Sequence, residues 1–541
     1  MINIKKTFNN IVSNNIFYYT LLVLFGALWG IGQHPNFFFI RFFGLIPFLY
    51  VVFKRKSYIL DTLIFGWLAY ILNFYWLFIT FFESGKLPIP VAIIIILVLC
   101  LYYGLQYPLI SFIFKKFYSF NKKILFYSFP IVFVTIDFLF PKLFRHTIGD
   151  SQIGFFPFIQ IIDITGMTGV ILIFLFFNLG IYKLLNNYFT KKKITLLHFL
   201  FVVPLLLALT YGFFRIEYLN KEIKKLPTTY AAMIQGNVTG KQKMDDNYFY
   251  TNIDRYNRLT GESFNGTPPE FVIWPESVFN RAYHGDPEFL QQFIYENYPA
   301  PMIIGVVVWT SNEMTNSSLL IKDKQKIAQY DKQHLLMFGE YIPFEKTFPF
   351  LRVLSPFSNN VKPGKTTSIF QIGNVKASVS ICFEDIFPEL IKKNVNQGSN
   401  IMVNITNDSW YGKDLGPLHH SILARLRAIE NRRSFYRCTA TGLSTASDIT
   451  GKVVTKSGMW REEVIKTRLP LYDKKTIYSY IGELFSYICI FVFIIIMLIM
   501  IRSYFIKIRI KKLKRNFDKK KLNSKKIKKI YLKELEKITK L

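Results

Sequence analysis

Cysteine is scarce in this chain, with only four cysteines among 541 residues. Cys100 and Cys489 lie within apolar runs, which leaves Cys382 and Cys438 in the polar part of the sequence. Four scattered cysteines do not form the framework of a disulfide-rich secreted protein. Each cysteine therefore needs an explanation at its own position, by packing or by chemistry.

Acidic residues are also scarce. The chain has 35 Asp and Glu against 67 Lys and Arg, a formal net charge of +32 at pH 7. Such an excess suits nucleic-acid phosphates or a membrane surface. Here the positive charges lie between apolar runs and in a tail after the last run, so we expect them to set membrane orientation and to contact anionic lipid. We expect no nucleic-acid partner.

Several motifs that would indicate other chemistry are missing. There is no glycine-rich phosphate-binding loop, and no G-x-S-x-G marks a serine nucleophile. His419 and His420 are adjacent, so they cannot share one helix face at the i, i+4 spacing of zinc ligands. We predict neither a metal nor a cofactor.

Long apolar runs are abundant instead. Hydrophobic residues make up 51% of the chain and aromatic residues 18%, which is typical of a membrane protein with a water-facing part. Each run is near the ~20 residues that a helix needs to cross the hydrocarbon core. We predict seven N-terminal spans and one C-terminal span, near residues 12–32, 36–53, 58–82, 88–114, 123–141, 154–182, 194–216 and 479–505.

The loops between these runs alternate in charge. Lys and Arg follow the second, fourth and sixth runs, whereas the intervening loops carry few. The positive-inside rule then predicts a cytoplasmic N-terminus and an extracytoplasmic segment before the last span. We predict four parts, which are a seven-helix membrane domain (1–220), a catalytic domain (221–475), an eighth span (476–505) and a basic cytoplasmic tail (506–541).

Four polar residues lie in or near these runs, namely Asp61, Asn73, Asp137 and Asp163. Such residues often mark function, but they can equally pair between helices. We favour structural roles for most of them. Asp163 is the best functional candidate, because it lies near the predicted outer face.

Residues 228–472 have a different pattern, in which short runs rich in Val and Ile alternate with polar segments. His419–Arg433 predicts a helix with Ile422, Leu426 and Ile429 on one face. Strands that alternate with helices favour an α/β layered domain. The predicted buried strands are Ala231–Ile234, Phe271–Trp274, Met302–Val308, Val375–Ile381 and Ile401–Ile405.

An acid, an ammonium and a thiol stand at or near the ends of buried segments. They are Glu276 in Trp-Pro-Glu, Lys332 in Tyr-Asp-Lys and Cys382 in Ile-Cys-Phe-Glu. Each alone could be a surface charge, a loop lysine or a core filler. Together they form a coherent set, in which a glutamate moves protons and a thiol is the nucleophile. Because a nearby ammonium lowers the pKa of a thiol, we expect an exposed thiolate that oxidants can attack.

These segments resemble the nitrilase (carbon–nitrogen hydrolase) superfamily. With seven spans before the domain and one after it, the chain looks like the membrane-bound branch, the bacterial apolipoprotein N-acyltransferases. The resemblance implies an αββα four-layer sandwich. Its supporting signatures are Gln235–Asn237, Trp274–Glu276, Phe338–Pro343, Asn404–Trp410 and Ala424–Glu430.

The resemblance implies a ping-pong reaction in the bacterial inner membrane, with the catalytic domain in the periplasm. Cys382 would take an acyl chain from a phospholipid as a thioester and pass it to the α-amine of a diacylglyceryl-modified N-terminal cysteine of a lipoprotein. Glu276 would be the general base and acid. Lys332, with the backbone N–H of Phe383, would stabilise the oxyanion. Glu340 would orient Lys332, and Glu384 would shape the site around the thiol.

The chain departs from the family pattern at a few positions. Phe383 stands where the family often has Tyr, and Met244 matches a loop Trp. Cys438 occupies a small-residue position in a strand, where we expect it to pack.

Two alternatives remain open. A membrane-anchored amidase of the same superfamily would hydrolyse a small amide, but it needs only one anchor span. A transporter with an inactive accessory domain would be indifferent to Glu276, Lys332 and Cys382.

Overall fold

The apolar runs are helical in the computed structural model, which describes residues 15–122, 125–279, 281–310, 313–354 and 361–519. Their outward faces are apolar too, and Ile94, Val98 and Leu498 are 60%, 60% and 59% exposed. A bundle with this surface needs apolar surroundings. Its helices are α2 (Asn15–Ile31), α3 (Phe38–Gly44), α4 (Ile46–Lys54), α5 (Tyr58–Phe74), α6 (Leu77–Ile79), α7 (Ile89–Gly104), α8 (Gln106–Phe120), α9 (Phe129–Leu139), α10 (Phe156–Ile159), α11 (Ile162–Phe189), α12 (Val203–Ile223) and α19 (Leu484–Lys519).

Four described helical segments are long and apolar enough to cross a membrane, or five if the bent pair Tyr58–Phe74 and Leu77–Glu83 is one span. Asn15–Ile31 and Leu125–Leu139 are apolar but shorter. The eight-span count and the four-part division therefore stay predictions. The basic tail beyond Lys519 lies outside the described residues. The four long segments are Pro35–Lys54, Ile89–Phe120, Ile162–Phe189 and Leu484–Lys512.

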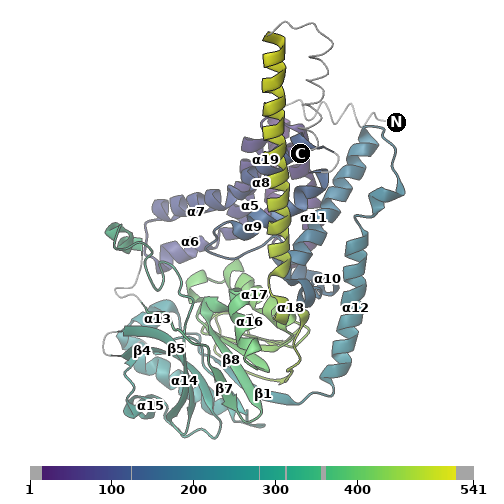
Figure 1. Cartoon of the computed structure of the whole chain (residues 1–541). Coiled ribbons are helices and arrows are strands. Elements are labelled where there is room, and N and C mark those ends of the chain that lie inside the picture. The colour runs from purple at the N-terminus through teal and green to yellow at the C-terminus, as the bar shows by residue number, and fades with distance from the viewer. Residues whose placement is uncertain (1–14, 123–124, 280, 311–312, 355–360, 520–541) are drawn as a thin grey trace.

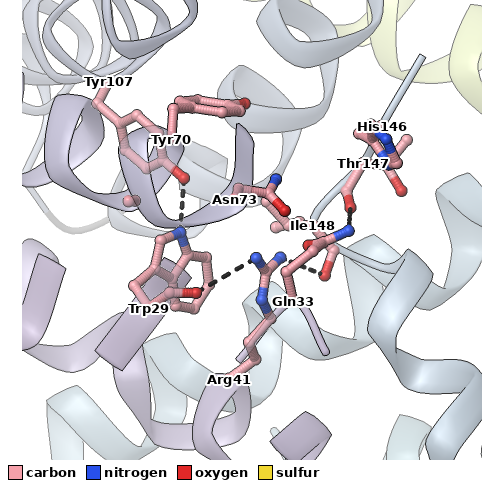
Figure 2. A pocket seen from close by; sticks show the side chains of 10 residues that line it. Trp29, Gln33, Arg41, Tyr70, Asn73, Tyr107, His146, Thr147 and Ile148 are labelled. Carbon is pink, nitrogen blue, oxygen red and sulfur yellow. Dashed lines mark hydrogen bonds between the residues drawn. The ribbon is translucent and has the colours of Figure 1, made fainter. Parts of the chain in front are cut away.

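Arg41, which interrupts the second predicted run, is buried inside the bundle at 3% exposure. Its guanidinium donates to the backbone oxygens of Ile148 at 2.9 Å and Trp29 at 3.3 Å. It borders a cavity of about 10 Å³, which Gln33 and Asn73 also line (Figure 2). That is about the space of one water molecule. Arg41 thus links α3 to the end of α2 and to the segment after α9, through the backbone oxygens of Trp29 and Ile148.

The middle of the chain forms two sheets. The first has the order β13 (Glu463–Pro470), β1 (Thr228–Gln235), β2 (Phe271–Ile273), β4 (Met302–Thr310), β5 (Glu313–Lys322) and β6 (Gln325–Asp331), and β3 (Ala282–Tyr283) also pairs with β4. The second has the order β12 (Val453–Lys456), β11 (Thr445–Ser447), β10 (Ser434–Thr439), β9 (Ile401–Thr406), β8 (Val375–Ile381) and β7 (Ile369–Ile372).

Alternate residues of the central strands face two different layers. Ala231 and Met233 of β1 belong to the core between the sheets, whereas Ala232 and Ile234 belong to the core under α14 (Phe249–Ser263). On the second sheet, Met402 packs with residues of α16 (Pro388–Asn396) and α17 (Leu415–Asn431). Strands that are buried on both faces explain the continuous apolar runs in the sequence. The result is the expected αββα sandwich.

The remaining short elements of the sandwich are α13 (Gly240–Met244), α15 (Pro287–Phe293), α18 (Ile477–Ile481) and the 3-10 turns η8 (Cys382–Ile386) and η9 (Asp408–Tyr411). Figure 1 shows the bundle above the sandwich, with α16, α17 and α18 on the side that faces the bundle. The five predicted strands are all confirmed, with ends shifted by a few residues. The predicted helix at His419–Arg433 is α17, which begins four residues earlier, at Leu415.

Asp163 joins the bundle to the sandwich. Its carboxylate accepts from Nε of Arg432 and from Nε of Arg215, both at 2.9 Å, and from the Tyr211 hydroxyl at 2.7 Å. The Asp163 and Arg432 side chains are 1% and 0% exposed. Arg432 follows α17 with a φ of +49°, so the end of this helix is fixed to α11. The structure gives Asp163 a structural place rather than a place among the predicted catalytic residues.

We predict that Asp163→Asn destabilises the chain. The change leaves Arg432 and Arg215 without a buried counter-charge, and breaking such a pair costs about 3–5 kcal/mol. Thermal unfolding in detergent would measure the loss. Glu222→Gln is the matched control, because Glu222 pairs with Lys474 at the surface. If both variants melt like the unmodified chain, Asp163 does not hold the two parts together.

Candidate active site

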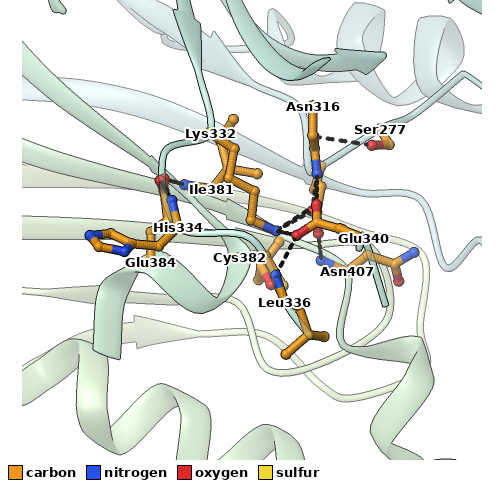
Figure 3. Close-up of polar contacts among 12 residues, drawn as sticks. Ser277, Asn316, Lys332, His334, Leu336, Glu340, Ile381, Cys382, Glu384 and Asn407 are labelled. Carbon is orange, nitrogen blue, oxygen red and sulfur yellow. Dashed lines mark hydrogen bonds and ion pairs between the residues drawn. The ribbon is translucent and has the colours of Figure 1, made fainter. Parts of the chain in front are cut away.

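The three predicted catalytic residues follow strands that end at the same edge of the sandwich. Glu276 comes after β2, Lys332 directly after β6 and Cys382 directly after β8. The segment after β2 passes so close to β4 that it requires Gly305, since a Cβ there would lie 2.5 Å from the Pro275 oxygen. Figure 3 shows that the side chains of Lys332, Glu340 and Asn316 converge near Cys382.

Lys332 lies between two carboxylates. Its Nζ atom is 2.9 Å from a Glu340 oxygen and 3.4 Å from Oε1 of Glu276, and its side chain is 1% exposed. The amide of Asn316 donates to both carboxylates, at 2.7 Å to Glu276 and 2.8 Å to Glu340. Burial lowers the pKa of Lys332, but Glu340 and Glu276 outweigh it and hold that pKa well above its usual value. Lys332 therefore stays an ammonium.

Glu276 is held by a second segment as well. Its Oε2 atom accepts from the backbone N–H of Asn407 at 3.0 Å. Burial would raise the pKa of the Glu276 carboxyl, but the ammonium groups of Lys332 and Lys243 keep it below its usual value. Glu276 is thus ionised at neutral pH and can accept a proton.

Cys382 corrects two of our expectations. Its side chain is buried, at 6% exposure, and not accessible as expected. Burial and the Glu276 carboxylate raise the pKa of its thiol above the usual value, and Lys332 opposes them only in part. The expected low pKa was wrong because it counted the ammonium and left out desolvation. At rest the site therefore holds carboxylate, ammonium and neutral thiol. The backbone at Cys382 has a φ of +52°.

Glu384 bridges the segments that carry Lys332 and Cys382. It is fully buried, and it accepts from the backbone N–H of Gln333 at 2.6 Å and of Ile381 at 2.8 Å. The Tyr330 hydroxyl donates to it at 2.9 Å. Burial raises its pKa to about 7 despite these donors. Through these hydrogen bonds Glu384 fixes the distance between the Lys332 ammonium and the Cys382 thiol.

A second charged cluster lies behind the site, and sequence reasoning missed it. His420 is 2.8 Å from Asp385 and 2.9 Å from Asp408, through its two ring nitrogens. Arg437 is 2.9 Å from Asp408. Burial lowers the pKa of His420, but Asp385 and Asp408 raise it to about 9. Because Asp385 is three residues from Cys382 and Asp408 is next to Asn407, the cluster ties together both loops of the site.

Sequence reasoning also missed Asn316 and Lys243. Asn316 is a buried amide within β5, and only the structure shows that it bonds the two carboxylates beside Lys332. Lys243 interacts electrostatically with Glu276 and Cys382. Its one sequence signal is that it precedes Met244, which is 55% exposed at the end of α13.

Phe383 and Cys438, the two other residues singled out in the sequence, are both buried in packed surroundings. Phe383 is 5% exposed, and its ring contacts Phe144 of the helical part, with centroids 5.4 Å apart. Cys438 packs in β10, as predicted; it lies between the two sheets, with its sulfur 3.4 Å from the Ile273 oxygen.

Two family models match neighbouring parts of the chain. The model of the apolipoprotein N-acyltransferase N-terminal domain matches residues 25–180, and the carbon–nitrogen hydrolase model matches residues 270–476. The chain belongs to the apolipoprotein N-acyltransferase family. The resemblance expected from the motifs is thereby confirmed, and the chain is an enzyme of the carbon–nitrogen hydrolase superfamily.

Curated relatives agree over most of the chain. The apolipoprotein N-acyltransferase of Geobacter metallireducens is 27% identical over 447 residues, covering 79% of this chain and 83% of that protein. The enzyme of the same name from Haemophilus influenzae is 26% identical over 511 residues, covering 89% and 95%. The similarity therefore spans the helical part and the sandwich together.

We predict that the thiol pKa responds in opposite directions to its two charged neighbours. Glu276→Gln removes a carboxylate and should move the alkylation of Cys382 by iodoacetamide to lower pH. Lys332→Met removes an ammonium and should move it to higher pH. Labelling rates between pH 6 and 11, read by mass spectrometry on a Cys438→Ser background, would measure the shifts. Identical profiles would contradict the proposed contacts.

We predict that His420 stabilises the fold in a pH-dependent way. Its folded pKa of about 9 lies above the ~6.5 of an unfolded histidine, so the contribution is complete below pH ~6.5 and is lost as pH rises through about 9. His420→Gln should cost up to ~3 kcal/mol at pH 6 and much less at pH 10. Denaturant unfolding at both values measures this, with the exposed His284→Gln as control. A loss that is equal at both pH values would show a neutral His420.

Proposed function

We propose that this chain transfers a fatty acyl chain from a membrane phospholipid to the α-amino group of a diacylglyceryl-modified N-terminal cysteine of lipoproteins. The observation that carries the proposal is the Glu276–Lys332–Cys382 arrangement in a chain of this family. Glu276, Lys332 and Cys382 are the proposed catalytic residues, and Glu340, Glu384 and Phe383 support them.

In the first half-reaction Cys382 attacks the ester carbonyl of the phospholipid. Because the thiol is neutral at rest, its proton passes to the ionised Glu276 during the attack. The charge that develops on the carbonyl oxygen is stabilised by the Lys332 ammonium and the backbone N–H of Phe383. The ester C–O bond then breaks, the lysophospholipid oxygen takes the proton from Glu276, and a thioester remains on Cys382.

In the second half-reaction the lipoprotein α-amine attacks the thioester. Glu276, ionised again, accepts a proton from the amine, and the same donors hold the oxyanion. The C–S bond breaks, the sulfur takes the proton from Glu276, and the amide product leaves. Glu340 and Asn316 act through Lys332 and Glu276, because they fix the ammonium and the carboxylate in place.

The apolar bundle beside the sandwich supports lipid substrates. Acyl chains can stay in hydrocarbon while the reacting carbonyl reaches the strand ends. The alternation of loop charges supports a multi-pass inner-membrane location with the sandwich in the periplasm. A small-amide hydrolase would need no such bundle, and no feature of the described residues favours that alternative.

We predict that the unmodified chain, incubated with labelled phospholipid, forms an acyl-protein that hydroxylamine cleaves, and that Cys382→Ser forms none. The reason is that only a thioester at Cys382 carries the acyl group. Mass spectrometry of the acylated peptide would locate it. Cys438→Ser is the matched control, because Cys438 is buried between the sheets, and it should retain the label.

The outcome also separates the alternatives. Ammonia released from a small amide without acylation of a lipopeptide would favour the amidase. Label in Cys382→Ser equal to that in the unmodified chain would end the acyl-transfer proposal.

A further inference from the structure

A second cavity is lined by Ile386 of η8 but by none of the three proposed catalytic side chains. Its volume is about 590 Å³, within the roughly 300–1,000 Å³ of small-molecule sites. Residues of α9, α11, α17 and the start of α19 line it, so it lies between bundle and sandwich. Figure 1 shows α9, α11 and the start of α19 on the side of α17 that faces the bundle, and α11 contacts α17.

One end of the cavity is apolar. Val134, Met167 and Ile171 line it, and all three are buried. Phe138 and Tyr487 also line it, but they are 40% and 59% exposed and contact each other, with ring centroids 5.9 Å apart. Aromatic side chains of this kind are typical of the border between hydrocarbon and water. The apolar end therefore suits an acyl chain.

The other end contains buried charged side chains, and some of their polar atoms have no hydrogen-bond partner among the described residues. Arg427 donates to Glu430 at 2.9 Å, and their side chains are 6% and 1% exposed. Nε of Arg427 and Oε2 of Glu430 are both buried and have no hydrogen-bond partner among the described residues. A buried polar atom without a partner is costly. Oε2 of Glu430 is therefore free to accept a hydrogen bond from a bound molecule.

The charge at this end is negative in excess. Lys142 and Arg145 also line the cavity, and they are already paired with Asp137 at 2.6 Å and with Glu389 at 2.6 Å. Glu483 accepts from the hydroxyls of Tyr478 and Ser486, and among the described residues no cation lies within ion-pair distance of it.

The carboxylates act on one another. Burial raises the pKa of Glu430, Arg427 lowers it, and Glu483, Asp150 and Glu389 raise it, with a net value of about 8. Several carboxylates therefore face one place, and a bound cation would relieve their repulsion.

We propose that this cavity binds a phospholipid with a primary-ammonium headgroup, at a site separate from the acyl donor at Cys382. The ammonium lies between Glu430 and Glu483 and donates a hydrogen bond to Oε2 of Glu430. The acyl chains lie along α9 and α11. A quaternary headgroup has no N–H to donate, and an anionic headgroup meets the carboxylates, so both bind less well.

The site touches the element that carries the nucleophile. Ile386, the last residue of η8, lines the cavity, and Nη1 of Arg427 is 3.5 Å from its backbone oxygen. A bound lipid would therefore support η8 from behind. The binding itself does not depend on the proposed acyl transfer.

The test uses the full chain with Cys382→Ser, so that no lipid is consumed. The protein in detergent is given equal amounts of palmitoyl-oleoyl phosphatidylethanolamine, phosphatidylcholine and phosphatidylglycerol, and native mass spectrometry counts the lipid retained. We expect a severalfold preference for phosphatidylethanolamine. Glu430→Gln and Glu483→Gln should remove the preference, and Ile171→Trp, which fills the apolar end, should remove retention. Glu217→Gln, an exposed carboxylate on α12, should change nothing.

Equal retention of the three lipids by the parent protein would overturn the proposal, whatever the variants do. A preference that survives both glutamine changes would do so too, because the lipid would then bind elsewhere. Displacement by soluble phosphoethanolamine at the same concentration would assign the site to a small amine and not to a lipid. Failure of acyl transfer in the unmodified chain would leave all of these results unaffected.

Discussion

The buried ammonium of Lys332 sets the conditions for the rest of the catalytic domain. A charge without water is tolerable only where opposite charge and hydrogen bonds replace the solvent. Glu276 and Glu340 supply that charge, and their buried oxygen atoms need further donors. The amide of Asn316 and the backbone N–H groups of Asn407 and Leu336 provide them. Strand β5, the end of β9 and the segment after β6 must therefore all be in place before Lys332 can be buried.

Buried charges are also paired along α17, away from Lys332. This helix carries His420, which binds the loops after β8 and β9, and Arg432 follows its end and binds Asp163 of the bundle. One helix thus connects the charged cluster behind Cys382 with the ion pairs that join the sandwich to the helical bundle. Arg427 and Glu430 on the same helix border the second cavity. Movement between bundle and sandwich would have to break ion pairs that are almost fully buried, so we infer that the two parts behave as one body near the site.

Sequence reasoning was strongest where the chemistry is local. The central strands are apolar on both faces, so runs such as Val375–Ile381 were visible without a structure. The residues that follow those strands were visible for the same reason. Asn316 was not visible, because a polar residue inside a strand gains meaning only from the side chain opposite. Asp163 looked functional, yet its partner Arg432 is 269 residues away in sequence. The thiol pKa was misjudged because burial leaves no mark in a motif. Helix lengths were also less regular than the apolar runs, since prolines and turns divide them.

The left-handed backbone at Cys382 has one more consequence. A side chain at a φ of +52° is strained by about 1–2 kcal/mol, and glycine would adopt this conformation freely. The neighbouring strand and turn hold Cys382 in this conformation against its own preference. Glycine at this position would relieve the strain but would remove the proposed catalytic thiol, so a search for stable variants that ignores activity favours the loss of this cysteine.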